Sequence, residues 1–99
     1  MTIHETREGN SLTVAVEGRL DTLAAPDLEK TLDNCPPSIG ELVLDFEKME
    51  YISSAGLRAV LHAQKIMQSR GGCLRIRNTN KLVYDVFRVT GLANILQFE

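Results

Sequence analysis

The sequence predicts an α/β fold: one domain with a single mixed sheet of four to five strands and helices packed against it. Short segments with the alternating or apolar pattern of strands are followed along the chain by longer segments with helical periodicity, and this order repeats. The 99 residues suffice for one hydrophobic core, so we expect a single domain over residues 1–99. Apolar residues make up 43% of the chain and charged residues 24%, a composition that excludes a disordered protein.

A hairpin is predicted at the start of the chain. Residues 11–17 alternate between apolar and small or polar side chains, which is the period of a strand, and the apolar positions are Leu12, Val14 and Val16. The turn-like residues 8–10 come directly before this segment. We therefore expect a first strand near residues 2–6 that folds back onto the second.

A helix is expected soon after residue 22. Pro26 fits its first turn, where the missing N–H of proline costs no hydrogen bond. The apolar positions that follow recur at the spacing of one helix face, and they are Leu28, Leu32 and Cys35. The pair Pro36-Pro37 is expected to end this helix.

The middle of the chain predicts a buried strand and a second helix. Residues 41–46 contain a short continuous apolar run, which is typical of a strand covered on both faces. Residues 47–50 are polar and are expected to form a loop that leads through Tyr51 and Ile52 to a helix. This helix is expected to reach about Arg70, because Gly71-Gly72 is a suitable stop.

The last third of the chain predicts one further strand and one further helix. Residues 73–77 alternate as a strand, and residues 78–80 are expected to form a loop that caps a third helix. Apolar positions mark this helix, which is expected to end at Gly91: Leu82, Val83, Val86 and Phe87. Residues 92–98 fit either a strand or a helical turn, and the pattern leaves both open.

Composition excludes several classes of function. The chain has 11 basic and 13 acidic residues and no long basic run, which argues against a nucleic-acid partner. It shows no signal peptide and no apolar run of membrane-spanning length, so we expect no membrane partner and a cytoplasmic location. Cys35 and Cys73 stand apart, so two reduced and partly buried thiols are expected, with no metal site and no cofactor.

Ser53 and Ser54 lie at the predicted start of the second helix, after a strand, where sites tend to form in α/β sheets. A serine at this position can cap the helix by accepting a hydrogen bond from a free backbone N–H. The same geometry suits a phosphate, because a helix start is electropositive. A phosphoserine there would add a charge of about −1.5 to −2 to the surface and change what can dock on it.

An enzyme is not expected. Residues 52–56 resemble the nucleophile motif G-x-S-x-G, but Ile52 replaces its first glycine. His62 lies eight residues after Ser54, about 12 Å along a helix, which is too far for a serine–histidine hydrogen bond. His4 is expected on an edge strand.

Several polar residues are candidates to accompany Ser54. Asp21 and Asp45 follow the predicted strands closely, so both are expected near the serine, with a turn or strand-end role as the alternative. Polar residues at i, i+4, i+7 and i+11 form a stripe along the second helix: Arg58, His62, Lys65 and Ser69. This stripe is either a docking face beside Ser54 or an ordinary solvated face.

Several segments together resemble the STAS domain family. They read E-G-R-L-D at 17–21, A-P-D-L-E at 25–29, L-D-F at 44–46, Y-I-S-S-A-G-L at 51–57 and V-T-G-L at 89–92. The resemblance runs in the right order over nearly the whole chain. The branch that this sequence resembles most closely is the bacterial anti-sigma factor antagonists, so a STAS-type domain is expected.

The resemblance implies a partner switch. Such antagonists bind an anti-sigma factor that is also a serine kinase with an ATP-binding fold, and this frees a sigma factor. The kinase phosphorylates a serine at a helix start, which disrupts the complex, and a metal-dependent serine/threonine phosphatase resets it. The matching serine, by its distance from Gly56-Leu57, is Ser54. The positions expected to contact the partner are Asp21, Ser53, Ser54, Gly56, Leu57, Arg58 and His62.

Two positions depart from the pattern of this branch. Many members carry an aspartate directly before the phosphorylated serine and a serine or threonine directly after it. This chain has Ser53 and Ala55 there, which makes Ser53 a rival phosphorylation site. The alternative function is a STAS scaffold, or a subunit of a stress-sensing or lipid-transport complex, that is not phosphorylated.

Overall fold

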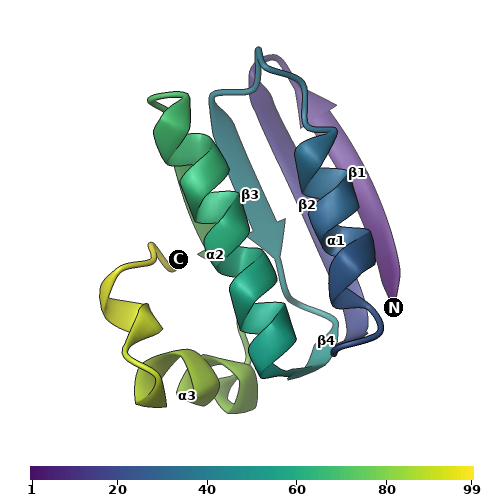
Figure 1. Ribbon diagram of the computed structural model, residues 1–99, viewed down its shortest axis with the longest axis vertical. Coiled ribbons are helices and arrows are strands. Elements are labelled where there is room, and N and C mark those ends of the chain that lie inside the picture. Colours follow the sequence, from purple (N-terminus) through teal and green to yellow (C-terminus); the bar gives the residue numbers. More distant parts are fainter.

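The computed structural model describes all residues, 1–99 (Figure 1). In chain order the elements are β1 (Thr2–Glu8), β2 (Ser11–Leu20), α1 (Ala25–Asp33), β3 (Glu41–Asp45), β4 (Met49–Ile52), α2 (Ser54–Ser69), β5 (Cys73–Arg77), α3 (Lys81–Val89) and a short 3-10 helix (Leu92–Asn94). No helix is both long and apolar enough to cross a membrane.

One five-stranded mixed sheet organises the chain. Four strands lie in the order β1-β2-β3-β5, and β4 pairs with β2 beyond the end of β3. β1 runs antiparallel to β2, while the pairs β2–β3, β2–β4 and β3–β5 are parallel. The predicted mixed sheet, the hairpin and the edge position of His4 are confirmed.

The helices α1 and α2 lie side by side over one face of the sheet (Figure 1). The apolar positions of the strands face them and are buried, among them Val14, Leu44 and Ile76. Together these layers form one hydrophobic core of 26 buried residues. The other face is polar and carries the ion pairs Arg75–Glu41 and Arg77–Asp45 between neighbouring strands, together with a contact between His4 and Glu17.

The expected loop over residues 47–50 is wrong in its second half, because β4 begins at Met49. Gly18 has a φ of 93°, and the pairing register between β2 and β4 shifts there. This irregularity lets the end of β2 pair with β4 instead of β3, so that Leu20 lies opposite Ile52. The short polar segment gave no alternation from which a strand could be recognised.

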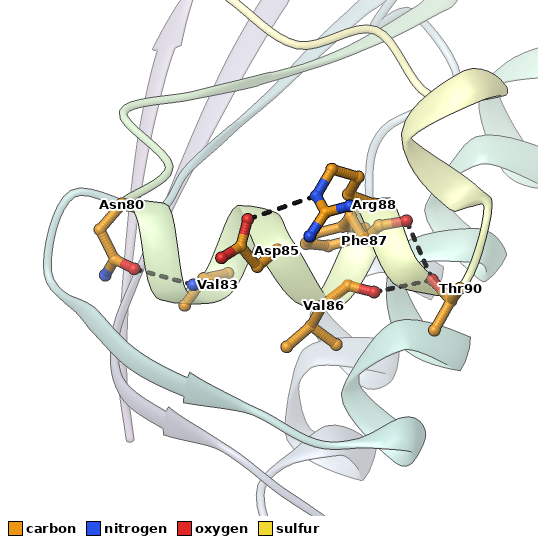
Figure 2. Close-up of polar contacts among 7 residues, drawn as sticks. All are labelled: Asn80, Val83, Asp85, Val86, Phe87, Arg88 and Thr90. Atoms are coloured by element: carbon orange, nitrogen blue, oxygen red, sulfur yellow. Dashed lines mark hydrogen bonds and ion pairs between the residues drawn. The ribbon is translucent and has the colours of Figure 1, made fainter.

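The helix α3 closes the core at the end of the sheet where β4 lies (Figure 1). Asn80 caps it, since its Oδ1 accepts a hydrogen bond from the Val83 N–H at 2.9 Å (Figure 2). The Asn80 amide also donates to the Met49 carbonyl oxygen at 2.8 Å and so ties α3 to β4. Buried Phe87 packs against Phe46, with ring centroids 6.4 Å apart.

Other details of the sequence predictions are corrected. The helix α1 ends at Asp33, so Cys35 lies beyond it, although its side chain is buried as predicted for that face. Cys73 is exposed, not partly buried, because its side chain lies on the open face of an edge strand. The terminal segment uses both of its open alternatives: a 3-10 turn, then a bridge between Phe98 and Ile76.

Candidate functional site

Ser53 is the N-cap of α2. Its Oγ accepts a hydrogen bond from the Gly56 N–H at 3.3 Å, and its backbone is extended, with φ −98° and ψ 176°. Its own N–H donates to the Leu20 carbonyl oxygen at 3.0 Å. The half-buried Ser53 thus uses both its hydroxyl and its amide to hold the helix start on the end of β2.

Ser54 is the first residue of α2 and its side chain is exposed. Its hydroxyl takes part in none of the side-chain hydrogen bonds of this structure, in contrast to that of Ser53. The capping role considered for either serine therefore belongs to Ser53. An aspartate is an equally good N-cap, so Ser53 can serve in the fold as well as the aspartate that the resemblance led us to expect there.

The start of α2 comes very close to β2 at Gly56. A Cβ atom added to Gly56 would lie 2.6 Å from the Leu20 carbonyl oxygen and 2.8 Å from Ile52 Cγ1. Leu57 is buried as well, with 7% of its surface exposed. Both residues therefore pack the start of α2 closely against the sheet. Ser54 and Arg58 lie on the exposed side of the helix.

Asp21 lies next to this helix start because it directly follows Leu20. Its Oδ1 accepts hydrogen bonds from the N–H groups of Leu23 at 3.1 Å and Ala24 at 3.0 Å, which gives the loop before α1 its shape. Asp21 therefore has the turn role that the sequence offered as the alternative. The loop presents Leu23 to solvent with 89% of its surface exposed.

Asp45 does not join the site. It pairs with Ala15 on β2, and the contact of Ser53 with that strand is at Leu20, five residues or about 17 Å further along. Partial burial opposes ionisation of Asp45, but hydrogen bonds from the Asn78 side chain and the Glu47 N–H, together with the Arg77 charge, outweigh it. They hold the pKa of Asp45 below its ordinary value of 3.8.

The polar stripe of α2 faces α1 along one edge. His62 Nε2 lies 2.7 Å from Asp33 Oδ1 of α1. Arg58 and Lys65 flank this pair and share with Glu29 and Leu61 a shallow hollow of about 240 Å³. The site therefore has a basic side on α2, next to the acidic residues of α1.

Two exposed features near the helix start were missed by the sequence analysis. Leu23 is one of them, and the other is Tyr51, whose ring carries the Arg19 guanidinium 4.2 Å above its centre. The signal for Leu23 was available: it is an apolar residue that belongs to neither the strand pattern before it nor the helix pattern after it. The pairing of Arg19 with Tyr51 depends on the register of β2 and β4.

These groups lie around the start of α2, where the hydroxyl of Ser54 makes no hydrogen bond. No base activates Ser54: His62, the next histidine along the chain, is engaged by Asp33. No group of three or more histidine, cysteine, aspartate or glutamate side chains is placed to hold a metal ion. The geometry is that of an α/β domain that presents one serine hydroxyl, free of hydrogen bonds, at the start of a helix.

Comparison with known proteins agrees with this class. The family described as "Mlab, STAS domain" matches residues 3–97. The chain belongs to the STAS domain family.

Similar proteins include a relative named anti-sigma-B factor antagonist from Bacillus subtilis, 26% identical over 87 residues, or 88% of this chain and 80% of the relative. An anti-sigma factor antagonist from Mycobacterium paratuberculosis has a solved structure with a TM-score of 0.82 and 22% identity, covering 98% of this chain and 83% of that one. The Bacillus cell fate determinant SpoIIAA in its phosphorylated form superposes with a TM-score of 0.78 and 16% identity, over 99% of this chain and 91% of that one. The two solved structures share the fold of this chain.

Proposed function

We propose that this protein is an anti-sigma factor antagonist that is switched off by phosphorylation of Ser54. In the unmodified state it binds an anti-sigma factor, a serine kinase with an ATP-binding fold, and so releases a sigma factor. Phosphorylation of Ser54 by that kinase ends the binding, and a serine/threonine phosphatase restores it. Binding and release, not catalysis by this chain, are its activity, and its place of action is the cytoplasm.

The division of roles between the two serines carries this proposal. Ser53 is half-buried and its hydroxyl holds the Gly56 N–H, so a kinase would have to undo the helix cap to reach it. Ser54 is exposed and its hydroxyl is free. Modification of Ser54 leaves the cap intact, so it changes the surface while the fold is kept.

The docking surface that we propose surrounds Ser54. Asp21 shapes the loop that exposes Leu23, and Arg58 stands one turn beyond Ser54 on α2. An exposed leucine beside charged groups is suited to a protein interface, where a central apolar contact is rimmed by polar ones. Ser53, Gly56 and Leu57 contribute by positioning the helix start, and His62 extends the surface toward α1.

Phosphorylation assays with matched variants test the site. Wild-type protein, Ser54→Ala and Ser53→Ala are incubated with ATP and an anti-sigma factor kinase from the same genome, and the products are mapped by mass spectrometry. We expect phosphate on Ser54 in the wild-type protein and in Ser53→Ala, and none in Ser54→Ala. Phosphate on neither serine of the wild-type protein would sink the proposal, and phosphate on Ser53 alone would transfer it to that residue.

Binding measurements test the switch itself. Titration calorimetry with the kinase should show that Ser54→Ala keeps the affinity of the unmodified protein, while Ser54→Asp weakens it, because the added charge is placed on the docking surface. Equal affinities of the two variants would contradict a switch at this position.

The alternative is a STAS scaffold, or a subunit of a stress-sensing or lipid-transport complex, that is not phosphorylated. One observation favours it: the description of the matching family names Mlab, not an anti-sigma factor antagonist. A gene for a transporter component next to this one, in place of kinase and phosphatase genes, would support the alternative.

A further inference from the structure

Arg58 lies four residues after Ser54 on α2, and both side chains are exposed. Residues four apart on a helix are neighbours on its surface, with Cβ atoms about 5–6 Å apart. A long side chain in a helix leans back toward the helix N-terminus, which directs Arg58 toward Ser54. An anion at the first of two such positions and a cation at the second is the favourable order.

The guanidinium of Arg58 is free. It forms none of the ion pairs and none of the side-chain hydrogen bonds of this structure, although Glu29 shares its hollow. Arg19, another cation near this surface, is engaged: it is stacked on Tyr51 and lies 4.0 Å from Asp21. On α2 itself, His62 is held by Asp33. Arg58 is therefore an unengaged cation one helical turn from Ser54.

The helix start favours a phosphate on Ser54, but acidic groups line the surface near the loop before α1. The first turn of α2 contains no acidic residue, but the hollow beside the loop before α1 is lined by three: Asp21, Asp27 and Glu50. A phosphate of charge about −1.5 to −2 on Ser54 would add to the negative charge at this end of the molecule, where Asp21 follows the Leu20 that bonds Ser53. A cation one turn along the helix offsets it.

We propose that Arg58 is the residue that holds the phosphate of Ser54. This inference rests on the proposed phosphorylation of Ser54 and names the group in the chain that responds to it. In the unmodified protein the guanidinium stands free on the docking surface, where an acidic group of the partner can pair with it. In the phosphorylated protein it pairs with the phosphate across one helical turn. Phosphorylation thus adds an anion and withdraws a cation from the same surface.

Phosphorus NMR of the full chain with phosphoserine installed at position 54 by an expanded genetic code tests this pairing. The second pKa of a phosphoserine is about 6. An i, i+4 ion pair is expected to lower it by about 0.15–0.4 units relative to the Arg58→Gln variant. Arg58→Lys should keep part of the shift. Lys65→Gln is the matched control. Lys65 lies about 16 Å from Ser54 along the helix axis, so its replacement should leave the phosphate pKa unchanged.

Each outcome decides the role of Arg58. Equal phosphate pKa values in the wild-type protein and Arg58→Gln, or an equal change in Lys65→Gln, would overturn it. A pairing should also move the Arg58 Nε–H resonance on phosphorylation, which a merely structural role would not do. Since the phosphoserine is installed without a kinase, failure of a kinase to modify Ser54 would count against the proposed function and leave this titration unaffected.

Discussion

The N–H of Ser53 donates a hydrogen bond to the carbonyl oxygen of Leu20 at 3.0 Å. This single bond joins the end of β2 to the start of α2. It brings Asp21, which follows Leu20, beside Ser54, which follows Ser53. Two segments about thirty residues apart in the chain thereby form one surface.

Removal of either serine hydroxyl should affect stability unequally. Ser53→Ala loses the cap of α2 and is expected to lower the free energy of unfolding by about 1 kcal/mol. Ser54→Ala should stay within about 0.5 kcal/mol of the wild-type protein. Urea unfolding followed by circular dichroism measures both, and Ser53→Asp, which keeps a capping oxygen, is the control. A larger loss of stability in Ser54→Ala than in Ser53→Ala would mean that Ser54, and not Ser53, caps the helix.

Gly56→Ala should destabilise the protein by about 1–3 kcal/mol, because its methyl group would overlap the Leu20 carbonyl oxygen and Ile52. The sign of the change is informative. In a helix without this contact, replacement of glycine by alanine stabilises by about 1 kcal/mol. Thermal unfolding distinguishes the two outcomes, and a higher melting temperature would show that α2 does not approach β2 as closely as described.

Asn80 is expected to contribute through two separable hydrogen bonds. Asn80→Ala removes the cap of α3 and the bond to Met49, and should cost about 2 kcal/mol in total. Asn80→Ser keeps a capping hydroxyl and loses only the bond to Met49, so about half of that loss is expected. Equal losses of stability in the two variants, measured by urea unfolding, would mean that only the bond to Met49 contributes.

Asp45 should make stability depend on pH under acidic conditions. Its pKa in the folded protein is below the ordinary value of 3.8, so its contribution is complete above that value and is lost as the pH falls through the folded pKa. The stability difference between the wild-type protein and Asp45→Asn should therefore shrink on acidification from pH 7 to below pH 3.8. A difference that stays constant over this range would contradict the hydrogen bonds from Asn78 and Glu47.

Leu23→Asp should weaken binding of the kinase partner by about tenfold or more without loss of stability, because the leucine is exposed next to Asp21. Ile95→Asp is the matched control: Ile95 is also exposed, with 59% of its surface accessible, but it lines a different hollow beside β5. Titration calorimetry should show an unchanged affinity for that control. Equal weakening by both substitutions would point to a nonspecific effect of charge.

Much of the fold followed from the sequence because the patterns involved are local. The alternation in β2, the helical spacing in α2 and the glycines after it predicted these elements to within a few residues. The serine pair at the start of α2 was also located, since a polar pair between a strand and a helix marks a helix start. The order of the family motifs along the chain supported the same fold.

Only the tertiary structure decided which groups of the site meet. Whether Ser53 or Ser54 caps the helix depends on where β4 leaves its partner strand, and the bond to Leu20 determines that point. The separation of Asp45 from the site follows from the shift of pairing at Gly18, which sends the end of β2 past β3 to β4. The sequence by itself determined the elements and a serine pair at the start of α2. The division of roles between Ser53, Asp21 and Ser54 required the fold, because hydrogen bonds between distant segments depend on register, which no local pattern contains.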